Sequence, residues 1–168
     1  VSPIAVTVTF TEAVTGFTSS DLSVTNGSVQ SFSGSGASYS FNVAPASDGE
    51  VSVSVSGGAA QDEAGNANTA AGLTRTYDGT APTVTLASAA PDPTSTRDIP
   101  VTATFSEPVT GFTVSDVVAT NGTVQDFTGS GASYTFTVVA SADGVVSVSL
   151  NGGAAQDAAG NGSAASSQ

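Results

Sequence analysis

The segment Ile4-Ala5-Val6-Thr7-Val8-Thr9-Phe10 decides the fold class, because large apolar side chains alternate along it with small or polar ones. This period of two places one face of a β-strand in a core. Residues 99–105 repeat the pattern, and similar alternations of Val, Phe and Tyr recur along the chain. The high content of Ser, Thr, Ala and Gly could by itself suggest disorder, but the periodicity predicts a folded all-β protein.

The sequence is an internal repeat. Residues 1–73 align without a gap with residues 96–168, and well over half of the aligned pairs are identical. The period has the size of one β-sandwich domain. We therefore predict two domains, at residues 1–77 and 78–168, joined by the short linker Asp78-Gly79-Thr80-Ala81-Pro82.

Turn signals divide each copy into short strands. Asn26-Gly27 is a strong signal for a two-residue hairpin, since both central positions of a type I′ turn need positive φ. We expect it to join Leu22–Thr25 to Ser28–Phe32, and the equivalent dipeptide of the second copy to act in the same way. Before this hairpin, a long loop crosses between the sheets, and we expect Phe17 and Phe112 to pin that loop to the core.

Each copy is short of one edge element. The first has no counterpart of Thr80–Ser95, and the second has none of Thr74–Asp78. We therefore expect the first domain to lack its first strand and the second to lack its last. A fragment boundary explains this most simply. The alternative is that a neighbouring copy donates the missing strand by β-addition, which would make the chain a homopolymer-forming subunit of a filament.

The charge balance limits the possible partners. Lys and Arg total 2 against 14 Asp and Glu, which gives a formal net charge of -12. Such a surface repels nucleic acid phosphates and anionic membranes and attracts cations, so we expect neither nucleic acid binding nor membrane insertion. No apolar run reaches the roughly 18 residues that a membrane helix needs. Cys and His are absent, which excludes thiol nucleophiles, imidazole bases and zinc sites built from them.

One loop motif occurs in both copies. Gln156-Asp157-Ala158-Ala159-Gly160-Asn161 and Gln61-Asp62-Glu63-Ala64-Gly65-Asn66 each offer a carboxylate and an amide oxygen around a flexible Gly. Two interpretations remain open. The loop is either part of a calcium site or only a turn, in which Asp closes an Asx turn and Gly or Asn takes positive φ.

Several segments in a fixed order resemble the bacterial immunoglobulin-like repeats of large surface adhesins. In the second copy these segments are Thr104–Phe112, Asp116, Asn121-Gly122, Gly131–Phe136, Asp143-Gly144 and Asp157–Asn161. The resemblance covers nearly the whole chain; Ala13 departs from it, where the second copy has Pro108. It implies two tandem immunoglobulin-like β-sandwich domains in an extracellular rod on a bacterial cell surface, in contact with neighbouring repeats and often stiffened by calcium between domains.

An immunoglobulin-like topology makes a geometric prediction about the acidic residues. It returns the chain after Phe105 to the pole where the domain begins, near Asp78. The residues that we expect to converge on a metal site there are Asp78, Glu107, Asp116, Asp157 and Asn161. In the first domain the equivalent set is Glu12, Asp62 and Asn66. Calcium takes six to eight oxygen ligands, and carboxylates clustered without a cation repel one another. Asp116 has the alternative of capping a turn.

Catalysis is not expected. Glu107 and Asp157 could in principle act as a glycosidase acid and base. However, the same pair is duplicated in the first copy, which suits a repeated structural element better than an active cleft. The function that we expect is a structural spacer stiffened by calcium, and the alternatives are the strand-donating filament and a glycan- or protein-binding module.

Overall fold

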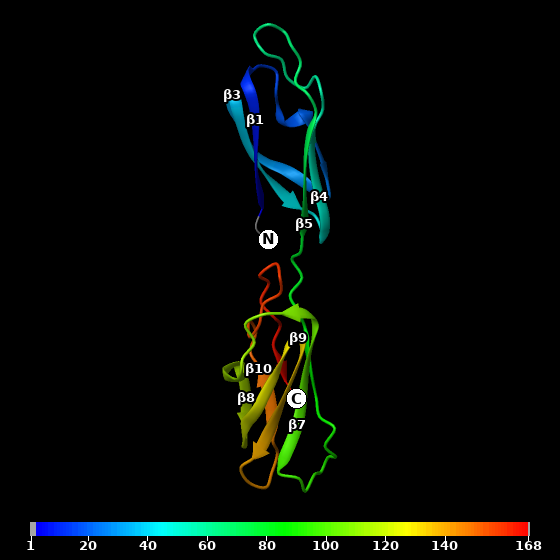
Figure 1. Cartoon of the computed structure of the whole chain (residues 1–168), viewed down its shortest axis with the longest axis vertical. Helices are drawn as coiled ribbons and strands as arrows, with labels where there is room; N and C mark the ends of the chain where they lie inside the picture. Colours follow the sequence, from blue (N-terminus) through cyan, green and yellow to red (C-terminus); the bar gives the residue numbers. More distant parts are fainter. Residues whose placement is uncertain (1–2, 168) are drawn as a thin grey trace. The chain divides into compact units, whose positions relative to one another are not determined.

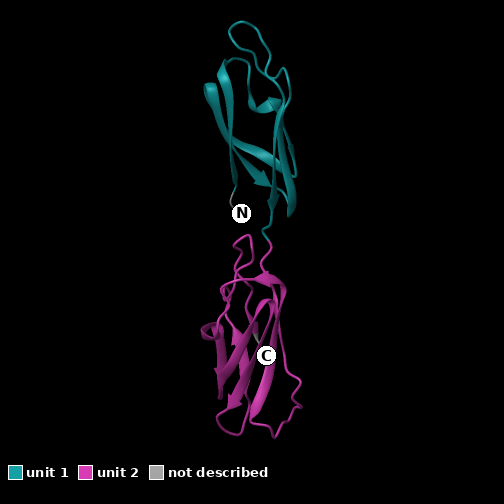
Figure 2. Ribbon diagram, viewed as in Figure 1, with its two compact units in different colours: residues 1–79 teal, residues 80–168 magenta. Residues whose placement is uncertain are grey.

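The computed structural model describes residues 3–167, which form two compact units. Unit 1 is Val1–Gly79 and unit 2 is Thr80–Gln168 (Figure 2). Within the described range no helix is long and apolar enough to cross a membrane. Apart from two short 3-10 turns, the regular structure of residues 3–167 is entirely β-strand.

Unit 1 contains two antiparallel sheets (Figure 1). One sheet pairs β1 (Ile4–Val14) with β3 (Gly27–Pro45), in a register that sets Val8 opposite Tyr39. The other has the order β2-β4-β5, where β2 is Leu22–Thr25, β4 is Gly49–Val55 and β5 is Ala71–Tyr77. The alternation read from the sequence produces this arrangement, because every second residue of β4 is buried between the sheets.

Unit 2 repeats this plan with one strand more. Its first sheet has the order β6-β7-β9, where β6 is Val84–Ala87, β7 is Asp98–Val109 and β9 is Gly122–Ala140. Its second sheet has the order β11-β10-β8, where β8 is Val117–Thr120, β10 is Ser147–Leu150 and β11 is Ser166–Ser167. Each unit is thus a sandwich of two sheets, which confirms the all-β, immunoglobulin-like fold class.

The edge strands differ between the units as the sequence predicts. Among the described residues of unit 1, no strand corresponds to β6, which pairs with β7 in unit 2. At the other edge the prediction is only partly right, because the second domain keeps the start of a last strand: β11 pairs with β10 in the register in which β5 pairs with β4.

The expected hairpin at Asn26-Gly27 is wrong. β2 pairs with β4 and β3 pairs with β1, so the dipeptide connects the two sheets instead of neighbouring strands. Only Asn26 has positive φ, at 56°. Its side chain donates to the main-chain oxygen of Ser47 (2.8 Å) and accepts from Ser47 N (3.1 Å), so it ties the crossing to the β3–β4 connection. That long-range contact outweighs the local turn preference.

The same aromatic cluster lies in the interior of each unit. Phe17 packs edge-on against Phe10 (ring centroids 5.2 Å apart) and Tyr39 (5.0 Å). Phe112 packs against Phe105 (5.2 Å) and Tyr134 (4.9 Å) in the same geometry. Phe17 and Phe112 are both buried, which confirms that they pin the crossing loops to the core.

Candidate metal centre

Asp157 is held by a loop that closes on itself. The backbone N–H of Asn161 donates to Asp157 Oδ1 (2.8 Å), and Asn161 Nδ2 donates to Asp157 Oδ2 (2.8 Å). Asp157 N donates in turn to the main-chain oxygen of Asn161 (3.2 Å). Gly160 lies between them with φ of 88°, a conformation that a side chain would strain. The repeated Asp-x-x-Gly-Asn motif is therefore a closed turn that presents one carboxylate.

Two sets of hydrogen bonds fix this loop to the sandwich. Thr110 N donates to Gln156 O (2.7 Å) and Gln156 N donates to Thr110 O (2.9 Å), which ties the loop to the end of β7. At the base of the loop, Ala155 N donates to Ser163 Oγ (3.2 Å), and Ser163 N donates to Ala155 O (2.8 Å). Because Glu107 lies on β7, three residues before Thr110, these bonds bring it close to Asp157.

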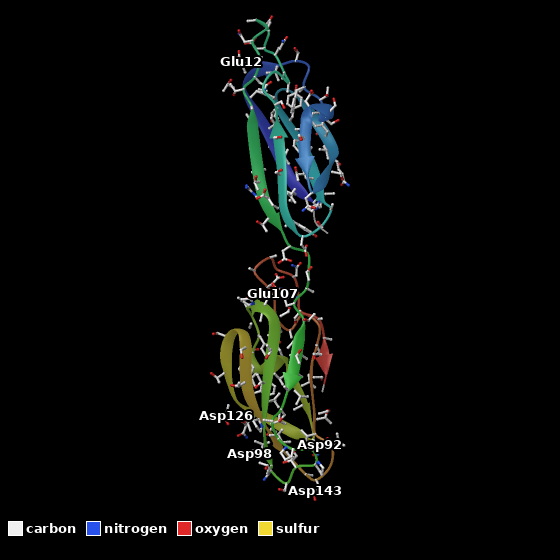
Figure 3. The ribbon with its side chains drawn as sticks, turned by 90° about the vertical axis from the view of Figure 1, so that its right-hand side faces the viewer. Glu12, Asp92, Asp98, Glu107, Asp126 and Asp143 are labelled. Atoms are coloured by element: carbon white, nitrogen blue, oxygen red, sulfur yellow. The ribbon has the colours of Figure 1, made fainter. Side chains whose placement is uncertain are left out.

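Three carboxylates meet here. One oxygen each of Asp78, Glu107 and Asp157 lies within 4.8 Å of the other two. Asp78 directly follows β5, Glu107 is on β7, and Asp157 is in the loop after β10. Figure 3 shows Glu107 at one end of unit 2, with Asp92, Asp98, Asp126 and Asp143 at the other. Of the residues that sequence reasoning assembled, these three are the ones that the structure places together as a group.

The spacing fits a calcium ion. Calcium–oxygen bonds are about 2.3–2.6 Å long, so two ligand oxygens on opposite sides of one ion lie at most about 5 Å apart. A mutual spacing within 4.8 Å satisfies that limit. The donors are also hard oxygen ligands, which suit calcium and not the softer transition metals.

Asp157 is a buried carboxylate, so its surroundings shift its pKa. Its side chain is only 4% exposed. Burial raises the pKa of Asp157, but hydrogen bonds from the side chain and backbone of Asn161 oppose it, and the net pKa lies below the usual 3.8. Asp157 is therefore a carboxylate at neutral pH, held within 4.8 Å of two further carboxylate groups. A divalent cation would neutralise this cluster.

The equivalent loop of unit 1 has the same internal bonds. Asn66 N donates to Asp62 Oδ1 (2.8 Å), and Asn66 Nδ2 donates to Asp62 Oδ2 (2.7 Å). The side-chain bond from Asn66 is the main reason that the pKa of Asp62 is lowered. However, Glu12 is exposed, and within residues 3–167 the only group of three carboxylates is the one in which Asp157 takes part. Glu12, Asp62 and Asn66 thus remain a predicted set, which no described residue completes to a group of three closely spaced carboxylates.

Asp116 and Asn161 have structural partners. Thr113 donates to Asp116 Oδ2 through its backbone N (2.8 Å) and its hydroxyl (2.7 Å), so Asp116 caps the 3-10 turn Val114–Asp116. This is the capping alternative that the sequence left open. The amide nitrogen of Asn161 donates to Asp157, so Asn161 positions that carboxylate, and of its side-chain atoms only Oδ1 would be able to contact an ion.

Sequence reasoning missed the base of the loop. Ser163 is 3% exposed and accepts a hydrogen bond from buried Ala155. In unit 1 the same position is Asn68, whose Oδ1 accepts from Ala60 N (2.8 Å). The two residue types differ, so the repeat alignment hides their common role. The sequence nevertheless contained a signal for this hydrogen bond, because Ser163 and Asn68 are both small polar residues with an acceptor oxygen.

Comparison with known proteins agrees with this architecture. Two successive sandwiches that repeat one strand plan define an immunoglobulin-like tandem protein. The family model of the bacterial Ig-like domain matches residues 2–77 and 78–168, so the chain belongs to that family and consists of two copies of its domain. All three clustered carboxylates fall within the second matched range. No curated protein and no solved structure gives a significant match.

Proposed function

We propose that the chain is a structural spacer of a bacterial surface protein and that it binds a calcium ion through Asp78, Glu107 and Asp157. Bacterial Ig-like domains commonly occur in surface or extracellular proteins, and their fold is typically non-catalytic. The observation that carries the calcium proposal is the convergence of three carboxylates, one of them buried, at a spacing that one ion can bridge.

The ion would act by neutralisation and restraint. Three carboxylates supply three to six of the six to eight oxygens that calcium requires, and water or main-chain carbonyls supply the rest. Without the cation, the like charges repel one another. Asp78 directly follows the last strand of the first repeat, so its coordination would reduce the freedom of the connection between the repeats. Each repeat then adds length, and the ion adds stiffness.

Binding to the folded state alone would also raise stability by mass action. At a ligand concentration about 100 times the dissociation constant, the gain is about 2.7 kcal/mol. Extracellular calcium modules have dissociation constants of about 10⁻⁴ to 10⁻³ M. A site in this range would be partly to fully loaded at millimolar calcium.

The proposal is tested by thermal unfolding of the 168-residue chain in EDTA and in millimolar calcium, followed by small-angle X-ray scattering under both conditions. We expect calcium to raise the melting temperature and to narrow the distribution of interdomain distances. Asp157→Asn should abolish both effects, whereas Asp62→Asn in the matched position of the first repeat should preserve them. A melting temperature and scattering curve that are the same in EDTA and calcium would refute the proposal and leave the motif as an ordinary turn.

A further inference from the structure

Asparagine is followed directly by glycine at four places in the chain: Asn26-Gly27, Asn121-Gly122, Asn151-Gly152 and Asn161-Gly162. An asparagine in this context can lose its side-chain amide without an enzyme, because the main-chain nitrogen of the next residue can attack the side-chain carbonyl carbon. Glycine favours the attack, since it has no side chain to obstruct it and its backbone is flexible. The four dipeptides are equivalent in sequence, but the fold places them in different surroundings.

Two of the four asparagines are held where the chain crosses between the sheets. Asn26 Nδ2 donates to the main-chain oxygens of Ser47 (2.8 Å) and Glu50 (3.2 Å), and Asn26 Oδ1 accepts from Ser47 N (3.1 Å). In unit 2, Asn121 Nδ2 donates to the main-chain oxygen of Ala142 (3.0 Å). Both asparagines are also half-buried. The attack would have to break these hydrogen bonds, so the folded state suppresses the reaction at both positions.

The third asparagine is held by the loop that presents Asp157. Asn161 Nδ2 donates to Asp157 Oδ2 (2.8 Å), and Asn161 N donates to Asp157 Oδ1 (2.8 Å). Because the acceptor is a carboxylate, these hydrogen bonds are stronger than those between neutral groups. The reaction at Asn161 therefore also requires the loop to open.

Asn151 differs from the other three asparagines. It directly follows β10 and is exposed, and within residues 3–167 no side-chain hydrogen bond restrains its carboxamide. The backbone beyond it is not crowded either: a Cβ added at Gly152 would come no closer than 3.7 Å to an atom outside its chain neighbours. The carboxamide of Asn151 can therefore turn toward Gly152 N without breaking a hydrogen bond of the described structure.

We propose that Asn151 is a self-modification site, at which the chain converts asparagine to isoaspartate and aspartate by intramolecular deamidation. The main-chain nitrogen of Gly152 loses its proton to a base in the solvent and attacks Asn151 Cγ. The new N–Cγ bond closes a cyclic imide, and the Cγ–Nδ2 bond breaks with release of ammonia. Water then opens the ring at one of its two carbonyl carbons, which gives isoaspartate or aspartate. Water is the only co-reactant, and nothing is oxidised or reduced.

The reaction changes both the charge and the backbone of the turn after β10. Each product carries a new carboxylate, and isoaspartate leads the main chain through the side-chain carbon, which lengthens it by one methylene group. The turn is closed by hydrogen bonds from Ala154 N to Asn151 O (3.3 Å) and from Gly153 N to Ser163 O (2.7 Å). We therefore expect isoaspartate to loosen this turn. The first repeat has no such site, because Ser56 stands at the aligned position.

The test follows the 168-residue chain during incubation at mildly alkaline pH and physiological temperature. All samples contain EDTA, so that failure of the calcium proposal cannot affect the result. Digestion with pepsin at acid pH stops further ring formation. Mass spectrometry with electron-transfer fragmentation then locates the gain of one mass unit and distinguishes isoaspartate from aspartate. The same chain in concentrated urea gives the reactivity of each asparagine without the fold.

We expect Asn151 in the folded chain to react at least about tenfold faster than the other three asparagines, because those react only through local opening. In urea the four rates should converge. If any of Asn26, Asn121 and Asn161 reacted as fast as Asn151 in the folded chain, the proposal would be overturned.

Two matched variants test the turn itself. Asn151→Ser copies the first repeat and should remove the fast reaction. Ser56→Asn should create a second fast site in unit 1, because Ser56 is also exposed and also precedes two glycines. A reaction at position 56 as slow as that at Asn26 would overturn the assignment to this turn. In the isoaspartate product, the amide hydrogen of Gly153 should exchange faster than in fresh protein, and equal exchange would contradict the expected loosening.

Discussion

Ser163→Ala should loosen the loop that presents Asp157. Ser163 Oγ is the acceptor for the backbone N–H of Ala155, which is 1% exposed, and Ser163 itself is 3% exposed. Removing the hydroxyl leaves that buried N–H without this acceptor, and an unsatisfied buried donor costs about 1–3 kcal/mol. The smaller side chain also leaves a small void. We therefore expect unit 2 to lose about 1–3 kcal/mol of unfolding free energy and to bind calcium more weakly.

The matched variant is Ser163→Asn, which introduces the residue type that accepts the equivalent backbone hydrogen bond in the first repeat. There, Asn68 Oδ1 accepts from Ala60 N at 2.8 Å. The asparagine should retain most of the stability that alanine loses. Urea titration with residue-resolved hydrogen exchange separates the two units, so the unchanged unit 1 is a control in each sample. A loss below about 0.5 kcal/mol for Ser163→Ala, where surface substitutions normally fall, would refute the reasoning, as would equal losses for alanine and asparagine.

Three further predictions follow from the structure. Asp157 and Asp62 have folded-state pKa values below the usual 3.8. The stability that they contribute is therefore complete above about pH 4 and is lost as the pH falls through the lower folded values. Urea midpoints measured from pH 6 to pH 2 should fall at the acid end, and they should fall less in Asp62→Asn than in the unmodified chain. Phe112→Ala should destabilise unit 2 by about 3–5 kcal/mol, and Phe17→Ala should do the same to unit 1, because both rings are buried in aromatic clusters. If hydrogen exchange showed that either variant lowers the unfolding free energy of both units equally, this prediction would be contradicted. Asp116→Ala should lower the unfolding free energy of unit 2 by about 1 kcal/mol, because the hydrogen bonds from Thr113 are lost. It should not change the calcium affinity. A large loss of affinity, measured by calorimetry, would instead make Asp116 a calcium ligand.

The strands could be predicted from the sequence, but their pairing could not be predicted fully. The alternation from Ile4 to Phe10 predicts only that one face of this strand is buried. That prediction is confirmed, because the burial of side chains along β1 alternates with the same period of two residues. Asn26-Gly27 gave a misleading local signal. The conformation of Asn26 depends on its hydrogen bonds to Ser47, a residue that is far away in the sequence.

The candidate site could be predicted in part. Asp157 and its turn were visible because the motif repeats, and the immunoglobulin-like topology predicted that Glu107 and Asp78 would approach it. The burial of Asp157 could not be predicted, since it depends on how the loop docks through Thr110 and Gln156.

Isothermal titration of calcium into the metal-free 168-residue chain tests the central claim most directly. The account predicts saturable binding at one principal site, with a dissociation constant of about 10⁻³ M or tighter, that disappears in Asp157→Asn and survives in Asp62→Asn. Magnesium should bind more weakly, because it demands a smaller and more regular octahedral site. The absence of saturable binding at several times that concentration, or equal affinity in the unmodified chain and Asp157→Asn, would contradict the account.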